Sequence, residues 1–131
     1  MYRTSAVLVA SALLLGGASV VAGAQPAPSG CNYIVTPPSV VNVSGTDMVT
    51  ATVVAGACDG AVTFQMVACL QMQGSSGPPE CARNNGILPA QVFFQPYRPG
   101  TTYTATGRGC STKGNPPQSI CQASGPRTAT L

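Results

Sequence analysis

The residues with the greatest chemical potential in this chain are its six cysteines: Cys31, Cys58, Cys69, Cys81, Cys110 and Cys121. Thiols can act as nucleophiles, bind metals or form disulfides. The 131 residues include no histidine and only three acids. The commonest general base and neutral metal ligand is therefore missing, and no base is evident that could activate a serine or threonine nucleophile. We expect a protein that is not an enzyme, uses no metal or cofactor, and has its cysteines paired in disulfides.

The charges of the chain are few and scattered. Six basic and three acidic residues give a formal net charge of +3. The acids Asp47 and Asp59 fall in separate predicted turns, too far apart for a mechanism that needs paired carboxylates. No basic cluster of the kind that binds nucleic acid or a membrane surface is present. The sequence therefore predicts neither partner.

The first 24 residues have the form of a secretory signal peptide. Arg3 supplies a positive charge, Ala6–Leu15 is almost entirely apolar, and Ala22-Gly23-Ala24 offers small residues at a cleavage site. The pattern predicts cleavage after Ala24. Because no basic stop-transfer cluster follows, we expect no membrane anchor after cleavage. The mature protein would be secreted, either to the medium or to the cell envelope.

The mature chain would keep all six cysteines and all twelve prolines. Six cysteines in an exported chain of this size are typical of three disulfides that stabilise a modest core. Residues 25–30 form a polar, proline-containing lead-in, expected to be flexible. A single domain is then expected over residues 31–131.

That domain has the pattern of an all-β protein. Short runs rich in β-branched residues alternate between apolar and polar positions and are separated by Gly, Pro, Asn and Asp. The run Ala61–Met72 predicts Val62, Phe64, Met66, Ala68 and Leu70 on its inward face. Residues 73–90 and 111–119 are expected to be loops. The seven predicted strands are Asn32–Thr36, Ser39–Ser44, Met48–Ala55, Ala61–Met72, Gln91–Gln95, Thr101–Arg108 and Ile120–Leu131.

One local motif narrows the architecture. The segment Tyr97–Ala105, with Pro99-Gly100 followed by Tyr103, resembles the corner before strand F in fibronectin type III and related immunoglobulin-like domains. The resemblance implies an immunoglobulin-like antiparallel β-sandwich of about seven strands, in which the Tyr103 hydroxyl bonds upstream backbone. The tryptophan typical of these domains is absent, and Tyr97 stands where leucine is usual. An ordinary turn before a strand is the alternative interpretation.

The sandwich topology limits the fifteen possible disulfide pairings. Antiparallel neighbours place the start of the strand that Cys31 opens beside the end of the strand that Cys58 closes, so that these two cysteines should meet. Cys69 lies late in its strand and should pair with Cys81 in the loop that follows. Cys110 and Cys121, at the two ends of the predicted loop 111–119, should form the third pair. Four of the six cysteines lie near one end of this topology, which leaves open an exchange of partners among Cys31, Cys58, Cys110 and Cys121.

The segment between the last two cysteines carries the most specific motif. It resembles the reactive loop of Bowman-Birk serine protease inhibitors, in which Thr-Lys-Ser-Asn-Pro-Pro-Gln lies in a small disulfide ring. The resemblance implies that Lys113 enters a trypsin-like specificity pocket and that rigid prolines keep the loop ordered before binding. Gly114 replaces the serine after the cleavage point, and the ring is larger. An ordinary hairpin loop is the alternative. The matching residues are Thr112, Lys113, Asn115, Pro116, Pro117 and Gln118.

A second candidate region is the predicted loop at residues 73–90. Its outline is similar to that of small exported sandwiches of the neocarzinostatin type, which have two short disulfide-closed loops and bind an apolar small molecule. Alternatively, the apolar residues nearby belong to the core or the sheet edges. The residues that could line such a cleft are Met66, Met72, Phe93, Phe94 and Tyr97.

The sequence thus favours an exported, non-catalytic binding module with a protein or a small apolar molecule as its partner. A serine protease inhibitor acting through Lys113 and a carrier of a small apolar ligand are the two alternatives.

Overall fold

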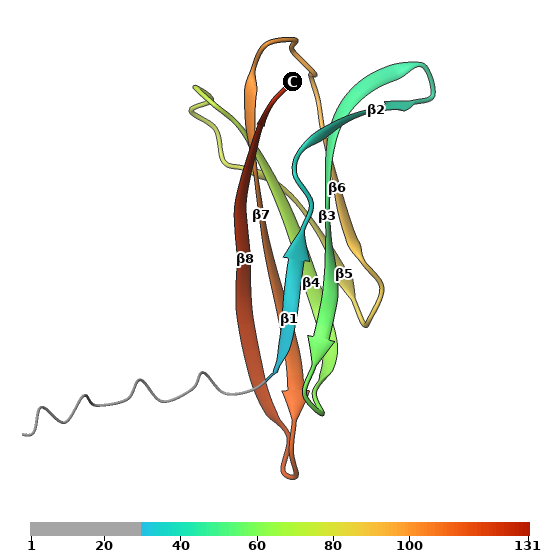
Figure 1. Cartoon of the computed structure of the whole chain (residues 1–131). Helices are drawn as coiled ribbons and strands as arrows, with labels where there is room; N and C mark the ends of the chain where they lie inside the picture. Colours follow the sequence, from blue (N-terminus) through green and yellow to red (C-terminus); the bar gives the residue numbers. More distant parts are fainter. Residues whose placement is uncertain (1–29) are drawn as a thin grey trace, which may run out of the picture.

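The computed structural model describes residues 30–131, which form two antiparallel β-sheets (Figure 1). The predicted signal peptide at residues 1–24 and the lead-in up to residue 29 lie outside the described residues. In the described part there is no helix that could span a membrane. The eight strands are β1 (Cys31–Val35), β2 (Ser39–Val43), β3 (Thr46–Cys58), β4 (Val62–Met72), β5 (Glu80–Asn85), β6 (Ala90–Phe94), β7 (Thr102–Lys113) and β8 (Gln118–Thr130).

The sheets pack face to face and confirm the predicted disulfide-containing β-sandwich. In the first sheet, β3 is the central strand and pairs with β1, β2 and β6. The second sheet has the order β5-β4-β7-β8. The long central strands of the two sheets, β3, β4 and β7, contribute most of the core. The fully buried side chains include Val35, Val49, Val53, Met66, Leu70, Val92 and Tyr103.

Side chains of the first sheet pack directly on β7 where this strand carries glycine at inward positions. A Cβ atom at Gly109 would lie 2.1 Å from Cε1 of Tyr33, and one at Gly107 would lie 2.5 Å from Cγ2 of Val53. The ring of Tyr33 therefore occupies the space that a side chain at Gly109 would need. Its hydroxyl is 3.0 Å from Oγ1 of Thr63, so this buried polar group has a hydrogen-bond partner.

The prediction that Val62 and Phe64 point inward is wrong. The register of β4 against β7 shifts between Thr63 and Gln65, which makes Phe64 an extra residue in the ladder. Such a β-bulge reverses the alternation of faces on one side of it. Val62 and Phe64 are 61% and 40% exposed, whereas Thr63 is buried; Met66 and the inward residues after it are placed as predicted.

The predicted loop at residues 73–90 contains a strand. β5 pairs with β4 over six positions, from Leu70 opposite Glu80 to Gln65 opposite Asn85. This edge strand has the sequence ECARNN and is largely exposed, so it lacks the apolar alternation by which strands are recognised. The strand leaves two shorter loops, residues 73–79 before it and residues 86–89 after it.

The second predicted loop is also mostly strand. β7 and β8 remain paired up to Lys113 opposite Gln118, so only residues 114–117 form the turn. Residues 114–119 are exposed at the end of a long hairpin, which is why the composition resembles that of a loop, whereas Ser111 is fully buried.

All three disulfides have the predicted pairing: Cys31–Cys58, Cys69–Cys81 and Cys110–Cys121. Each joins residues directly opposite each other on neighbouring strands of one sheet. Their Cα atoms are only 4.0 to 4.1 Å apart. The disulfides therefore link strands within the sheets rather than one sheet to the other.

Candidate functional site: two hollows at the tyrosine-corner end

The chain crosses between the two sheets, from β6 to β7, at a corner built around Tyr103. Its side chain is fully buried, and its hydroxyl accepts a hydrogen bond from the backbone N–H of Arg98 at 2.9 Å. The same hydroxyl donates to the carbonyl oxygen of Pro96 at 3.3 Å. Gly100 has a φ of +78° in the turn between them, a conformation that suits glycine. The tyrosine thus bonds the upstream backbone as the sequence motif implies, and it fixes the crossover.

We call this end of the sandwich the tyrosine-corner end. It carries the β2–β3 hairpin, the β4–β5 loop and the C-terminus, all at the top of Figure 1. The opposite end, which we call the cystine end, carries Cys31–Cys58, Cys110–Cys121 and the turn of the β7–β8 hairpin.

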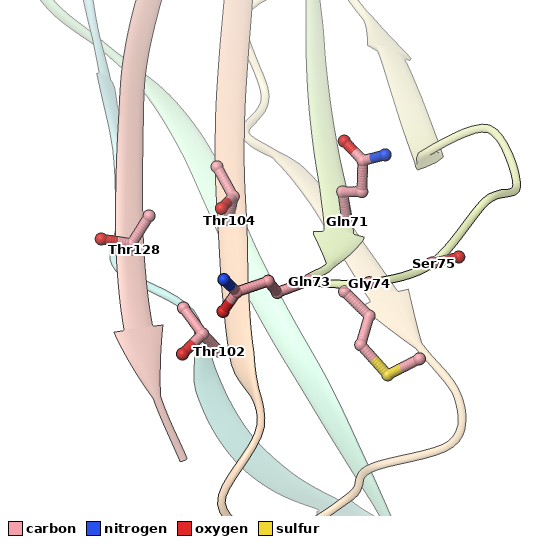
Figure 2. Close-up of a pocket in the computed structure, with 8 residues that line it drawn as sticks. Gln71, Gln73, Gly74, Ser75, Thr102, Thr104 and Thr128 are labelled. Atoms are coloured by element: carbon pink, nitrogen blue, oxygen red, sulfur yellow. The ribbon is translucent and has the colours of Figure 1, made fainter.

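The first hollow at the tyrosine-corner end, the Gln–Thr hollow, has a volume of about 300 Å³. Register places Gln71 beside Thr104 and Thr104 beside Thr128, so one row of outward side chains crosses β4, β7 and β8. Figure 2 shows the amide of Gln73 extending over β7 between Thr102 and Thr104. The lining residues are Gln71, Met72, Gln73, Gly74, Ser75, Thr102, Thr104 and Thr128.

Six of the eight residues that line this hollow have an uncharged hydrogen-bonding side chain. Each threonine hydroxyl and each glutamine amide can both donate and accept hydrogen bonds. The strand ends below them are held in place, because the backbone N–H of Gln73 donates to the carbonyl oxygen of Thr102 at 2.9 Å. The hollow is therefore suited to a neutral ligand with several polar groups.

The second hollow, the Phe–Glu hollow, lies where β5 begins and β6 ends and also measures about 300 Å³. It is lined by the last residues of β6 and by Glu80, the first residue of β5. The ring of Phe94 is held by an edge-to-face contact with Tyr103, with 5.8 Å between ring centroids. Phe93 is 42% exposed. The lining residues are Met48, Glu80, Phe93, Phe94 and Gln95.

The five residues expected to line an apolar cleft are therefore divided among three places. Phe93 and Phe94 line the Phe–Glu hollow, and Met72 borders the Gln–Thr hollow. Met66 is fully buried, and Tyr97 packs against the core. The inward side chains of β4 and β6 pack in the core between the two sheets. The five residues therefore do not line a common cleft.

The motif similar to the protease-inhibitor loop lies at the cystine end. Thr112 and Lys113 belong to β7, and Gln118 begins β8 directly opposite Lys113. Gly114, Asn115, Pro116 and Pro117 form an exposed turn. The Lys113 Nζ is 3.3 Å from the Asp59 Oδ2 in the β3–β4 turn, with the two side chains 34% and 76% exposed. Lys113 would have to leave this ion pair to enter the pocket of a protease.

The acidic residues are far apart in the fold. Asp47 and Asp59 flank the length of β3, a separation of about 40 Å at the usual rise per strand residue. Asp47 accepts a hydrogen bond from the amide of Asn42 at 3.0 Å. Among residues 30–131 no three potential metal ligands come together, and the six cysteines are all in disulfides.

Reasoning from the sequence missed most of the residues that line the two hollows. The Gln–Thr hollow is assembled from three strands whose registers are not visible in the sequence. Its one local signal is the alternation of threonines at residues 102, 104 and 106 and again at 128 and 130, which places a row of hydroxyls on one face. The sequence gives no signal for Glu80, because the polar strand that it opens has the composition of a loop.

Comparison with known proteins finds no family model, no curated protein and no solved structure that matches this chain.

Proposed function

We propose that this chain is an exported, non-catalytic binding module that binds its ligand at the tyrosine-corner end. The observation that carries the proposal is the position of two open hollows of about 300 Å³ on either side of the β4–β5 loop. Residues 71–75 before and within the loop border the Gln–Thr hollow, and Glu80 after the loop borders the Phe–Glu hollow. Binding residues commonly lie on loops that a rigid scaffold positions.

An immunoglobulin-like architecture is the second part of the proposal. Its main support is Tyr103, which lies near the start of β7 just after the chain crosses between sheets, as the corner tyrosine of such domains does. The four-stranded order β5-β4-β7-β8 opposite a sheet centred on β3 is compatible with this architecture. The disulfides differ, because in residues 30–131 all three lie within a sheet.

Export is the third part. The signal-like residues 1–24 motivate it, and three disulfides fit an oxidising compartment. Intact-mass analysis of the protein in the medium or cell envelope of its host tests it. We expect a chain that begins at Gln25 and is lighter by the six hydrogens lost from three disulfides. A chain found only inside the cell, with residues 1–24 retained and its thiols free, would contradict export.

The Gln–Thr hollow supports a neutral, hydroxyl-rich ligand, for which saccharides are the natural probes. Saccharide hydroxyls donate and accept hydrogen bonds, as do the threonine hydroxyls and glutamine amides that line the hollow. Because the hollow is open and shallow compared with a buried pocket, we expect dissociation constants of the order of 1 mM.

Nuclear magnetic resonance tests this ligand class directly. The oxidised mature protein, labelled with ¹⁵N, is titrated with neutral oligosaccharides of glucose, galactose, mannose and N-acetylglucosamine. We expect at least one to shift the side-chain amides of Gln71 and Gln73 and the backbone amide of Thr104. Gln73→Ala should weaken that binding by about fivefold, the value of one hydrogen bond. Gln118→Ala, at the cystine end, is the matched control and should leave it unchanged.

If no saccharide of the panel shifts these residues at millimolar concentration, the saccharide proposal is wrong. Shifts confined to the cystine end would contradict the proposed binding end.

Serine protease inhibition is a second candidate, favoured by the projection of the β7–β8 turn at the tip of a long hairpin (Figure 1). The Lys113–Asp59 pair that must open is a surface pair, worth about 0 to 1 kcal/mol. Trypsin titrated with the oxidised protein provides the test. Inhibition that Lys113→Ala abolishes would support this function, and no inhibition at micromolar excess would end it.

Carriage of a small apolar ligand is motivated by Phe93 and Phe94 in the Phe–Glu hollow. Native mass spectrometry of protein purified from its own host would show the added mass of a carried molecule. Its absence would count against a carrier.

A further inference from the structure

Glu80 brings a negative charge to the Phe–Glu hollow, and no lining residue carries a positive charge to balance it. Asp47 is hydrogen-bonded to Asn42, and Asp59 is paired with Lys113. Within residues 30–131, Glu80 is the one acidic residue whose carboxylate makes no hydrogen bond or salt bridge. Glu80 lines the hollow together with two phenylalanines and a methionine. A nearby cation stabilises the charged form of a carboxylate that lies next to apolar surface.

The apolar part of the hollow is rigid on one side and accessible on the other. Phe94 is fixed from below by the buried ring of Tyr103, whose hydroxyl is itself held by the backbone of Arg98 and Pro96. Phe93, the preceding residue on β6, faces outward and remains 42% exposed. An aromatic face that is exposed beside a carboxylate provides the setting for a cation–π contact.

We propose that the Phe–Glu hollow binds an arginine side chain of a protein partner. The guanidinium group would pair with the Glu80 carboxylate and lie against the ring of Phe93, while its methylene stem would pack on Met48. Arginine fits better than lysine because its planar group stacks on aromatic rings and has five donors. The side-chain oxygen of Gln95 offers a second acceptor for these donors.

This site is distinct from the Gln–Thr hollow in its residues and in the charge of its ligand. The proposal extends the proposed binding function, but it does not depend on saccharide binding. Either hollow can fail its test while the other passes, because the two titrations use different probes and report on different residues.

The test is a titration of the oxidised, ¹⁵N-labelled mature protein with N-acetyl-arginine amide. N-acetyl-citrulline amide, which has nearly the same shape but no charge, is the matched neutral probe. We expect the arginine probe to shift the amides of Glu80, Phe93 and Gln95 with a dissociation constant of the order of 10 mM, as befits a few-atom ligand on an open site. Citrulline should bind at least fivefold more weakly, and added salt should weaken only the arginine complex.

Two variants assign the interaction. Glu80→Gln should weaken arginine binding by about fivefold, the upper range for one exposed charge pair. Phe93→Leu should weaken it by about threefold through loss of the aromatic face. Asp59→Asn removes the same charge at the cystine end and should leave binding unchanged. A dispersed amide spectrum in each variant establishes that it is folded.

Four results would overturn the proposal. Equal binding of arginine and citrulline would make the hollow merely apolar, and an unchanged affinity in Glu80→Gln would remove the carboxylate from the site. Dissociation constants of tens of millimolar are about the weakest that count as binding. If the arginine probe at that concentration shifts none of the amides of Glu80, Phe93 and Gln95, the hollow is not a binding site. Tighter binding of N-acetyl-lysine amide or of tetramethylammonium would replace arginine by another cation.

Discussion

The two ends of this sandwich are stabilised in different ways. At the cystine end, the disulfides Cys31–Cys58 and Cys110–Cys121 link neighbouring strands, and Gly109 lets the ring of Tyr33 lie directly on β7. At the tyrosine-corner end, the large buried ring of Tyr103 fills the core and packs against Phe94. The cystine end thus combines a close approach of the sheets at glycine with disulfides inside each sheet, whereas the tyrosine-corner end is filled by aromatic packing.

The difference shows how a small domain can combine rigidity with a binding surface. Where the sheets are close, a few buried atoms and two disulfides stabilise the strands. Where aromatic residues fill the core, the adjoining strand ends and the β4–β5 loop leave two hollows on the surface. Changes at the cystine end should therefore affect mainly stability, whereas changes at the tyrosine-corner end should affect binding as well.

The largest effect is expected for removal of the Cys31–Cys58 disulfide in the double variant Cys31→Ala, Cys58→Ala. The bond spans 27 residues, and the chain-entropy model assigns about 3.5 kcal/mol to a loop of that length. Denaturant unfolding should show this loss. The double variant Cys69→Ala, Cys81→Ala, which opens a 12-residue span, should cost about 3 kcal/mol. A loss below about 1 kcal/mol for the first pair would show that the cystine end does not rely on its disulfide.

A similar but smaller loss is expected for Gly109→Ala. The added methyl group would meet the Tyr33 ring, and overpacking of this kind costs about 2 to 3 kcal/mol. Gly77→Ala is the matched control, because its Cβ would meet only the Ser75 Oγ at 3.8 Å, and it should change the unfolding free energy by less than about 0.5 kcal/mol. Equal effects of the two substitutions would contradict the close approach of the sheets.

At the tyrosine-corner end, Tyr103→Phe should cost about 1.5 kcal/mol, because the Arg98 N–H and the Pro96 carbonyl lose their side-chain partner. We also expect faster amide hydrogen exchange in residues 93–101 and weaker ligand binding in both hollows. Amides at the cystine end should keep their protection. A uniform rise in amide exchange over the whole sandwich would mean that the two ends do not open independently.

The smallest effect is expected for Asp59→Asn. The ion pair with Lys113 is exposed, and such pairs contribute at most about 1 kcal/mol. We expect a loss below about 0.5 kcal/mol that disappears at high salt. Unfolding measured at low and high ionic strength checks it, and a larger loss insensitive to salt would show that this pair helps to hold the cystine end together.

The sequence was most informative where alternation was strong and where topology left few choices. The inward face of Met66, Ala68 and Leu70 and the three disulfide pairs could be predicted from it. The bulge at Phe64 could not, because one extra residue in a ladder depends on the partner strand.

The candidate site was harder to predict than the fold. The Gln–Thr hollow needs the registers of β4, β7 and β8, and the Phe–Glu hollow needs β5, whose polar edge strand carries no apolar alternation. The Lys113 motif was visible in the sequence, but its ion pair with Asp59 comes from a turn 54 residues away along the chain.

The central claim is that the ligand binds at the tyrosine-corner end, and a map of amide chemical shifts tests it most directly. One labelled sample of the oxidised protein is titrated first with the neutral oligosaccharides and then with N-acetyl-arginine amide. We predict shifts in residues 71–75, 102–104 and 128 with the first and in residues 80 and 93–95 with the second. Shifts that cluster in residues 111–119 with either probe would contradict the account.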